Sequence, residues 1–364
     1  MKNVFGNNVS ITIFGESHGK AIGATLDGLG AGIKIDEEFI KSQLALRRGQ
    51  RSISTGRNEK DEYQIISGVH NGFTTGTPIT VIIPNNDVKS SDYNSLDTVA
   101  RPSHADYCVN VKYKGYQDKR GGGHFSGRIT AGLVAVGAIC ISALKQKGID
   151  IGTHIKRCAC IDDDNFGTNL KNEIDILNSL DFAVLNEAKG KLMQEAILNA
   201  KENGDSVGGV LETAVLGMPT GIGEPFFDSI ESTLSHALFS IPSVKGIEFG
   251  LGFGIADLTG SKANDSFAIE NEKVVTLSNN NGGINGGISN GMPIIFRLAI
   301  KPTPTIFREQ KTIDFAKNEE VVLLPKGRHD PAIIHRARVV VDSMTAIALC
   351  DLLACVYGTE YFGE

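Results

Sequence analysis

The sequence has 364 residues, of which 41% are hydrophobic and 21% are charged, a composition typical of a globular protein rather than a disordered one. Its 36 basic and 42 acidic residues give a formal net charge of -6, which argues against bulk binding of nucleic acid. No apolar run reaches ~18–20 residues without a polar interruption, so we expect no membrane span.

The six cysteines show no spacing typical of a metal site or a redox pair, because only one residue separates Cys158 from Cys160. The first residues, MKNVFGNNVSITIFGESHG, contain neither an apolar signal core nor a cleavage site. These features predict a cytoplasmic protein with reduced thiols and no bound metal.

The first third of the chain contains short β-rich runs. Strands are predicted over residues 9–14, 21–26, 63–69 and 78–84. A helix is predicted from Asp36 through Arg48. A polar stretch over 85–108 follows, and structureless loops longer than ~12–15 residues are uncommon unless they are functional lids or disordered. How the loop at 84–103 moves is left open by the sequence.

From Arg128 the sequence predicts a helix that ends at Gly148, and its nearly all-round apolar surface places it in the middle of the fold. The later elements are predicted in this order: a strand over 149–161, an acidic surface excursion over 162–181, a helix over 188–202, a strand over 207–218, a helix over 228–240 begun by Asp228, a strand over 246–253, a glycine-rich loop over 279–291, a strand over 292–300 and a final helix over about 338–356. Because no linker or repeat is visible, residues 1–364 are predicted to form one interwoven α/β or α+β domain.

Common nucleotide-binding and hydrolase motifs do not fit. GESHGKA (15–21) has three residues between its glycines where a P-loop needs four, and an alanine follows its lysine. GLGAG (28–32) and GLGFG (250–254) lack the G-x-G-x-x-G spacing of a dinucleotide-binding turn. The chain also contains no G-x-S-x-G nucleophile turn in these segments.

Three histidines lie in polar or glycine-bearing turns, and imidazole is the side chain best suited to exchange protons near neutral pH. They are His18 in GESHGK, His104 in RPSHAD and His329 in KGRHDP. Each histidine has a carboxylate nearby in sequence: Glu16 for His18, Asp106 for His104 and Asp330 for His329. His104 and His329 also have an arginine nearby, Arg101 and Arg328 respectively. Arginine donates in a fork that matches carboxylate and phosphate groups. The pattern predicts an acid–base site for a multiply anionic substrate.

The stretch RGGGHFSGR (120–128) places three glycines in a row, each of which costs roughly 0.5–1 kcal/mol relative to alanine. It is either a flexible surface turn or a backbone segment that approaches a phosphate or a flat cofactor.

Seven of these motifs together resemble chorismate synthase. They are FGESHG, RPSHADY, KRGGGHFSGR, SIPSVKGIEFG, NGGINGGISNG, KPTPT and KGRHDP, in the family's order from Phe14 to Pro331. The resemblance implies conversion of 5-enolpyruvylshikimate-3-phosphate (EPSP) to chorismate, the last common step of the shikimate pathway and of aromatic amino-acid biosynthesis. The reaction is an anti-1,4-elimination of phosphate and a ring proton that requires reduced FMN without net redox. The implied fold is an α+β, β-α-β sandwich with central helices between two antiparallel sheets, assembled as a homotetramer.

The resemblance also implies catalytic roles. His18 corresponds to the acid that assists phosphate departure, and His104 to the residue that protonates or steadies the reduced flavin. Asp330 corresponds to the carboxylate that relays the substrate's proton, while Ser17 and Ser126 match the serines beside nitrogen-5 of the flavin.

Substrate and cofactor residues carry over in the same way. The substrate's anionic groups are assigned to Arg47, Arg128 and Arg328, with Arg48 and Arg51 as further candidates. The FMN cradle is assigned to His124, Phe125, Ser126, Pro242, Ser243, Gly286, Lys301, Pro302, Thr303, Pro304, Thr305 and Arg328. If the enzyme also reduces its own flavin, Arg47 is the candidate contact for NADP.

The sequence departs from the family pattern at three places. RRGQRS is apparently one residue shorter than the family's RRRPGQS, so the second family arginine is either Arg51 or lost to Ser52. Ser103 stands where the family has a glycine, which restricts that turn. His124 and Phe125 replace RS, and Phe125 either packs on the flavin ring or faces the core.

Two alternatives remain at this stage. The first is a flavin-dependent oxidoreductase that consumes NADPH, and the second is a non-catalytic protein that binds a phosphorylated ligand. The sequence does not tell whether flavin is reduced intrinsically with NADPH or by an external reductant or reductase, nor whether a tetramer needs FMN.

Overall fold

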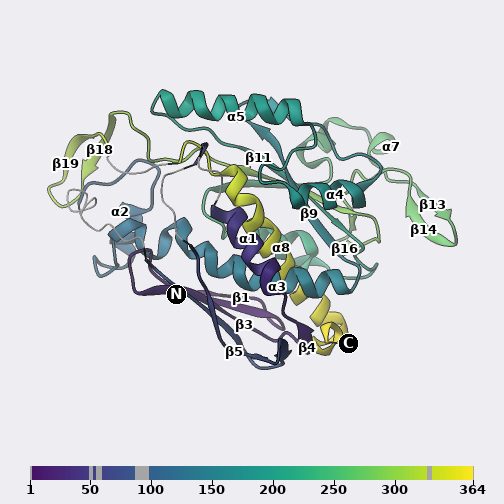
Figure 1. Ribbon diagram of the computed structural model, residues 1–364. Coiled ribbons are helices and arrows are strands. Elements are labelled where there is room, and N and C mark those ends of the chain that lie inside the picture. Colours follow the sequence, from purple (N-terminus) through teal and green to yellow (C-terminus); the bar gives the residue numbers. More distant parts are fainter. Residues whose placement is uncertain (1, 49–51, 55–59, 87–97, 326–329, 364) are drawn as a thin grey trace.

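Two antiparallel five-stranded sheets enclose a layer of helices (Figure 1). The computed structural model describes residues 2–48, 52–54, 60–86, 98–325 and 330–363. The first sheet has the order β1-β2-β3-β8-β5, with strands Val4–Phe5, Ser10–Gly15, Ala21–Asp27, Ile79–Pro84 and Gln64–Ser67. The second has the order β10-β9-β11-β17-β12, with strands Ile161–Asp162, Asp150–Cys158, Gly209–Leu216, Ile294–Ile300 and Val244–Phe249.

Three helices fill the space between the sheets: α1 (Glu37–Arg48), α3 (Thr130–Gln146) and α8 (Ile334–Tyr357). Helix α3 packs on β3 and β8 of the first sheet, whereas α8 packs on β9 and β11 of the second. The two helices also pack against each other, and α1 lies against both. This arrangement confirms the predicted sandwich of helices between antiparallel sheets.

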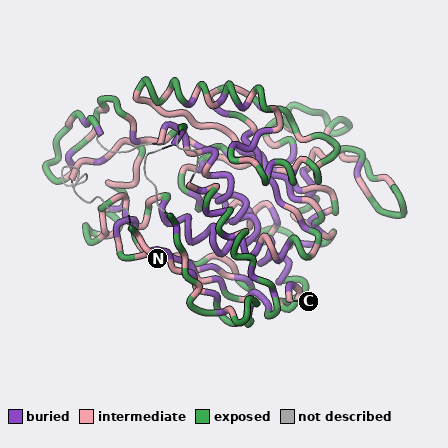
Figure 2. The backbone as a smooth tube through the Cα atoms, viewed as in Figure 1, coloured by how far each residue is buried: buried purple, intermediate pink, exposed green. Residues whose placement is uncertain are grey.

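The central helices are buried nearly all round, as Figure 2 shows. Small residues permit the close packing, because a Cβ added at Gly132 would lie 2.8 Å from the backbone of Gly23, and one at Gly137 would lie 2.3 Å from Cβ of Ser343. The segment Gly127–Gln146 and helix α8 are long and apolar enough to cross a membrane by length and composition, but 83% and 89% of their apolar windows lie inside the fold. Burial between the sheets accounts for that composition.

The outer elements cover the sandwich and extend from it. They are helices α2 (Asp106–Lys112), α4 (Leu170–Ser179), α5 (Glu187–Glu202), α6 (Ile230–Leu238) and α7 (Gly260–Ala263), and the 3₁₀ turns η2 (Arg120–Phe125), η3 (Gly127–Ile129), η4 (Phe226–Asp228), η5 (Gly252–Asp257) and η6 (Thr359–Phe362). Hairpins are formed by β13 and β14 (Phe267–Glu270, Lys273–Thr276), β15 and β16 (Ile284–Asn285, Ile288–Ser289), and β18 and β19 (Gln310–Asp314, Glu319–Leu323). A small sheet joins β4 (Ala31–Lys34), β7 (Phe73–Thr75) and β6 (Val69–His70).

The predicted surface excursion over 162–181 was wrong in part, because it contains helix α4, which packs against β9. Ile174 and Leu177 are spaced by three residues and are buried on the sheet side. Asn169 caps the helix by accepting a hydrogen bond from the N–H of Asn172. The helix was not predicted because most residues of the segment are polar or acidic and only Ile174 and Leu177 face the sheet.

Backbone conformation explains other differences from the predicted elements. The strand predicted over 149–161 ends at Cys158, because Ala159 and Cys160 have positive φ. The strand predicted over 246–253 ends at Phe249, before Gly250 (φ 56°). The predicted loop over 279–291 contains the β15–β16 hairpin, whose turn residues Gly286 and Gly287 have positive φ.

Other predicted boundaries also move. The strand predicted over 63–69 is divided at Gly68 (φ 83°) into β5 and β6, and α2 begins inside the polar stretch over 85–108. The cap of α6 is Ser229 rather than Asp228, since the Ser229 Oγ accepts from the N–H of Ser232. The final helix starts at Ile334, four residues earlier than predicted.

A row of charged side chains crosses the second sheet, and we call it the cross-strand ladder: His154 on β9, Glu212 on β11, Arg297 on β17 and Glu248 on β12. Consecutive members are register partners on adjacent strands. His154 Nε2 contacts Glu212 Oε2 at 3.0 Å, and Arg297 donates to Glu212 Oε1 at 2.9 Å and to Glu248 Oε1 at 2.6 Å. The other ring nitrogen of His154 contacts Asp163 Oδ2 at 2.9 Å.

Candidate active site

The glycines of η2 adopt a conformation that other residues rarely take. Gly121, Gly122 and Gly123 have φ of 59°, 81° and 53°, so all three lie in the left-handed region that costs L-residues roughly 1–2 kcal/mol each. A Cβ at Gly123 would also lie 2.1 Å from the carbonyl oxygen of Asp118. The flexible-turn interpretation therefore gives way to a defined backbone path that requires glycine.

Four of the predicted catalytic side chains lie around this glycine turn. A Cβ at Gly121 would lie 2.6 Å from the His18 ring and 3.0 Å from Ser17 Oγ. A Cβ at Gly122 would lie 3.6 Å from the His104 ring and 3.8 Å from Cβ of Ser126. The absent side chains thus leave room for both histidines to approach the same short stretch of backbone.

The turn after β2 is fixed to the glycine turn by two hydrogen bonds. Ser17 N–H donates to the carbonyl of Gly123 at 3.0 Å, and His124 Nδ1–H donates to the carbonyl of Gly15 at 2.8 Å. His124 therefore clamps two segments that carry candidate catalytic residues. Phe125 is 39% exposed and contacts Tyr113, so the hypothesis that its ring faces the core was wrong.

His104 is oriented by a carboxylate. Its Nδ1 lies 2.8 Å from Asp106 Oδ1, and Arg101 holds the same carboxylate with Nε and Nη2, each at 2.8 Å. Burial of Asp106 opposes ionisation, but hydrogen bonds from Arg101 and His104 outweigh it and hold the pKa of Asp106 well below its usual range. An ionised Asp106 accepts the Nδ1 proton of His104, which leaves Nε2 to exchange protons.

Two of the predicted substrate arginines lie side by side with a carboxylate between them. Arg47 Nη2 donates to Asp61 Oδ2 at 2.9 Å, and Arg128 Nη1 donates to Asp61 Oδ1. We call these two residues the arginine pair. Burial lowers the pKa of Arg47, and the neighbouring cations Arg336 and Arg128 lower it further. The charge of Asp61 raises it, but burial dominates, so the pKa of Arg47 falls to about 10. The Arg47 guanidinium thus remains cationic near neutral pH.

Hydrogen bonds connect the arginine pair to the other predicted residues. Arg336 donates through Nε to the carbonyl of Arg47 at 2.9 Å and through Nη1 to Asp330 at 2.6 Å. On the other side, Arg128 Nε donates to Asn85 Oδ1 at 3.0 Å. Asn85 in turn donates to the carbonyls of Glu16 and Gly19 on either side of His18. A continuous path thus runs from Asp330 to the His18 turn.

The KPTPT segment meets the His104 turn. Lys301 Nζ donates to the carbonyl of Ser103 at 2.7 Å, and its N–H donates to the carbonyl of Ser243 at 3.0 Å. Burial and the nearby charge of Lys245 lower the pKa of Lys301. Ser103 has φ of 57°, so it retains a left-handed conformation despite its side chain. Pro242, Pro302, Pro304 and the buried Thr305 flank these contacts along the chain.

Some predicted residues fall elsewhere. Gly286 is exposed at the tip of the β15–β16 hairpin, and a Cβ there would meet no atom within 4 Å. Its neighbour Gly287 packs against Ser229 and Glu224, not against the glycine turn. Arg48 Nη1 donates to the carbonyl of Lys60 at 3.2 Å at the edge of the site. Arg51, Arg328 and His329 lie outside the described residues.

Asp61, Asn85 and Arg336 belong to the site but lie outside the sequence motifs. Asp61 stands in the charge-rich run NEKDEYQ, where nothing distinguishes it from a solvated carboxylate. Asn85 begins a polar stretch, and Arg336 follows the KGRHDP motif without belonging to it. Their importance comes from contacts between residues far apart in sequence, as between Arg336 and Arg47, which are 289 positions apart.

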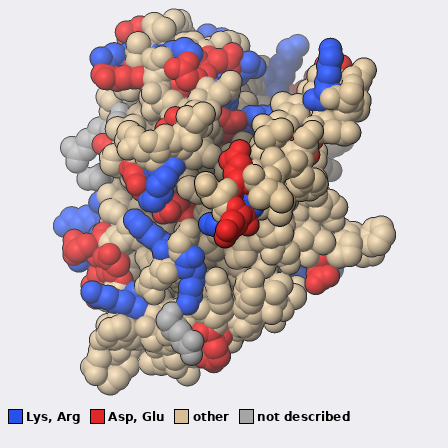
Figure 3. Space-filling model, turned by 90° about the vertical axis from the view of Figure 1, so that its right-hand side faces the viewer, with Lys and Arg blue, Asp and Glu red and all other residues tan. Residues whose placement is uncertain are grey.

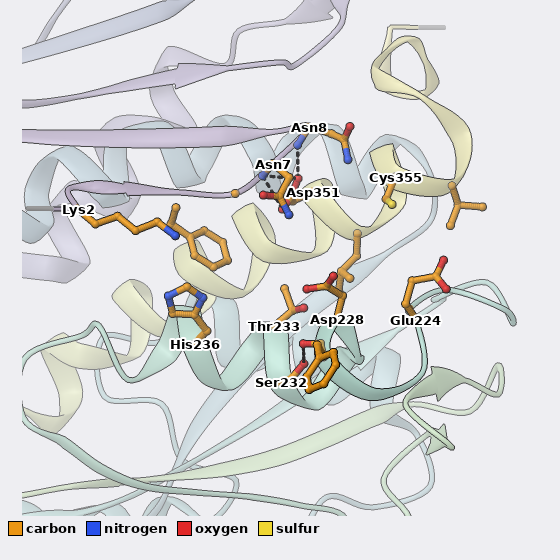
Figure 4. Close-up of a pocket in the computed structure, with 16 residues that line it drawn as sticks. Lys2, Asn7, Asn8, Glu224, Asp228, Ser232, Thr233, His236, Asp351 and Cys355 are labelled. Carbon is orange, nitrogen blue, oxygen red and sulfur yellow. Dashed lines mark hydrogen bonds between the residues drawn. The ribbon is translucent and has the colours of Figure 1, made fainter.

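A cavity of about 310 Å³ lies apart from these residues, beside β1, α6 and the C-terminal part of α8 (Figure 4). It contains none of the predicted site residues. The carboxylate of Asp351, which lines it, already accepts the backbone N–H groups of Asn7, Asn8 and Val9. The cavity therefore does not compete with the glycine turn as the candidate active site.

Comparison with known proteins decides the family. The model of the family described as chorismate synthase matches residues 9–354. The chain belongs to the chorismate synthase family. The match confirms the resemblance predicted from the sequence motifs, and the lyase function, rather than an oxidoreductase that consumes NADPH, is the one it supports.

Curated relatives and a solved structure agree with this family. The chain is 44% identical to chorismate synthase of Thermococcus kodakarensis over 348 residues, covering 96% of each chain. It is 46% identical to that of Lachnoclostridium phytofermentans, covering 96% of this chain and 94% of the relative. A crystal structure of chorismate synthase superposes with a TM-score of 0.76 at 30% identity, covering 97% of this chain and 94% of that one.

Proposed function

We propose that the chain converts EPSP to chorismate by eliminating phosphate and a ring proton in the presence of reduced FMN. The observation that carries the proposal is the path of hydrogen bonds from Asp330 through the arginine pair to the His18 turn. It joins acid–base groups to buried cations, which is what loss of a phosphate anion together with a proton requires.

The arginines supply the affinity for a substrate that carries a phosphate and two carboxylates. Arg47 and Arg128 form the buried part of this cation cluster and Arg48 its edge. Arg51 and Arg328 belong to the same proposed set on family grounds. Guanidinium donors suit these anions because each can give two parallel hydrogen bonds to one phosphate or carboxylate group.

The acid–base steps are assigned to groups around the glycine turn. His18 donates a proton to the departing phosphate, since its ring packs on Gly121 next to the turn that Asn85 ties to Arg128. His104 exchanges a proton at Nε2 because Asp106 holds Nδ1. Asp330 accepts the ring proton within the relay, and Arg336 Nη1 donates a hydrogen bond to its carboxylate at 2.6 Å. Ser17 and Ser126 extend the relay beside the turn.

Reduced FMN fits the residues between the glycine turn and the KPTPT segment. The glycine turn brings the His18 and His104 rings beside one stretch of backbone, and Thr303 Oγ1 is buried without a partner among the described residues, as expected where a ligand supplies the hydrogen bond. The residues that would hold it are His124, Phe125, Ser126, Pro242, Ser243 and Lys301 to Thr305, with Gly286 and Arg328 as further candidates on family grounds. When bound, reduced FMN supplies electron density for the elimination without net redox.

A homotetramer is supported by large apolar side chains that the fold leaves exposed. Phe226, Phe227 and Phe253 are each more than 80% exposed, and exposed apolar surface is typical of interfaces between subunits. The β13–β14 hairpin projects from the body of the molecule with Phe267 and Ile269 exposed (Figure 1). The face from which this hairpin projects has broad areas that carry neither Lys or Arg nor Asp or Glu (Figure 3).

The shared core of both sheets and the central helices favours one domain over residues 1–364. Three of the cysteines, Cys140, Cys158 and Cys350, are buried as thiols, consistent with a reducing cytoplasmic compartment.

The decisive experiment is an anaerobic assay with purified protein, FMN, dithionite and EPSP. Chorismate and phosphate should appear in equal amounts, and no product under these conditions would refute the proposed function. A second arm uses aerobic NADPH and FMN without dithionite. Product there would indicate an intrinsic reductase, with Arg47 as the first candidate contact for NADP, whereas no product would indicate an external reductase.

A further inference from the structure

Asp61 occupies an unusual position for a carboxylate. Its side chain is completely buried, and each of its two oxygens accepts a hydrogen bond from a different buried guanidinium. Burial opposes its ionisation, but the charges and hydrogen bonds of Arg47 and Arg128 lower the pKa of Asp61. An ionised Asp61 therefore neutralises one of the two positive charges of the arginine pair.

The two arginines differ in the donors that they have left. Arg128 also donates to Asn85 Oδ1 through Nε and to the carbonyl of Pro84 through Nη2, so the protein occupies all three of its nitrogens. Among the described residues, Arg47 makes only a 3.5 Å contact from Nη1 to the carbonyl of Gly127 besides its pair with Asp61. Its Nε is buried and has no partner among the described residues. A buried donor without a partner is costly and is expected where a ligand supplies the acceptor.

The backbone around Asp61 is also specialised. Asp61 has φ of 54°, a conformation uncommon outside glycine, and it lies three residues before β5. Strand β5 pairs with β8, which ends at Pro84 directly before Asn85. Asp61 and Asn85, which both accept hydrogen bonds from Arg128, thus lie next to the ends of two neighbouring strands of the first sheet.

We propose that Asp61 is a positioning residue, an internal counter-anion that fixes the spacing of the arginine pair and fills the space between the two guanidiniums. Small anions such as inorganic phosphate are then kept out of that space, while the larger substrate binds across the remaining donors, beginning with Arg47 Nε. This inference rests on the proposed function for the identity of the substrate, but the role of Asp61 toward anions is independent of it.

The first test is chemical rescue of Asp61→Ala, which opens a carboxylate-sized space between the guanidiniums. We expect KM for EPSP to rise about tenfold or more, the effect of losing a charged hydrogen bond, with kcat changed much less. Formate should lower KM again in this variant and leave the wild-type protein unaffected. Formate should also raise Tm of the variant without flavin or substrate present.

The second test uses Asp61→Asn, which keeps the shape of the side chain and so serves if the alanine variant does not fold. Inorganic phosphate should raise the Tm of this variant more than that of the wild type, and its Ki as a competitor of EPSP should fall about tenfold, because the neutral amide no longer compensates the charge of the two guanidiniums, which then attract an anion to their remaining donors. The Tm measurement needs no catalysis, so it remains decisive even if the wild type forms no chorismate.

Asp351→Ala is the matched control, because Asp351 is equally buried but, in the described part of the chain, accepts only backbone N–H groups. It should lose stability while keeping KM and its response to phosphate. Variants of Asp61 that lose Tm but keep KM, and that respond to formate and phosphate as the control does, would overturn the proposal and leave Asp61 with a purely structural role.

Discussion

The cross-strand ladder and the arginine pair are both buried ionic clusters, yet they are built in opposite ways. The ladder is formed by register partners within one sheet, and with Asp163 every carboxylate in it has a cationic partner. The arginine pair is assembled from α1, η3 and the segment before β5, with one carboxylate for two guanidiniums and, among the described residues, no acceptor for Arg47 Nε. A closed cluster holds the fold together, whereas an open one remains able to bind an anion.

The largest expected effect comes from breaking the ladder. His154→Ala leaves the buried carboxylate of Asp163 without its cation and leaves Glu212 with Arg297 alone, which should lower the free energy of unfolding by about 3–5 kcal/mol. Urea denaturation measures this change. At a temperature where the variant is folded, kcat and KM should equal those of the wild type, and a selective loss of activity would mean that the ladder belongs to the active site.

The next effect is on chemistry rather than stability. His104→Ala should lower turnover by ~10²-fold or more while FMN still binds, as expected for a lost proton-transfer group. Stopped-flow chorismate formation and a flavin titration separate the two properties. Near-normal turnover would refute the assignment of His104.

A smaller effect is expected from the glycine turn. Gly121→Ala places a methyl group 2.6 Å from the His18 ring at a position with φ of 59°, so it should cost about 1–2 kcal/mol of stability and reduce turnover ~10-fold through displacement of His18. Gly127→Ala is the control, because that glycine is exposed and a Cβ there would meet nothing within 4 Å. Equal losses in the two variants would contradict the close-approach explanation.

The smallest effect is a pH dependence of the ladder. Burial opposes charging of His154, but hydrogen bonds to Asp163 and Glu212 outweigh it and raise its pKa. Stability from His154 is therefore complete below its unfolded pKa of ~6.5 and is lost as the pH rises through its folded pKa. Urea unfolding from neutral to alkaline pH should show a decline in the wild type that is absent in His154→Ala. A parallel decline in both would assign it to other groups.

Sequence patterns predicted most strands and the burial of α3, because alternation and an all-round apolar surface are local properties. They did not predict that α8 shares the central layer, although its composition gives the same signal, nor that α4 covers the second sheet. Element ends were missed where positive φ at Ala159 or Gly250 stops a strand, since tertiary contacts set those angles.

The site was predictable in its residue types and only partly in its geometry. Motifs supplied His18, His104 and Arg128, and the structure places all three around one turn or its hydrogen-bonded neighbours. Asp61 could not have been found from the sequence, because its meaning depends on two arginines that come from different elements.

The place of α8 has a consequence for the order of folding. Both sheets precede α8 along the chain, so the inner face of the second sheet is synthesised before the helix that covers β9 and β11 exists. The loop before β2 is likewise anchored by Asp351, more than 340 residues later. Contacts of such range form slowly, and until they form the apolar face of the second sheet remains open to other chains. The core between the two sheets therefore remains incompletely packed until α8, the last α-helix of the described chain, has been synthesised.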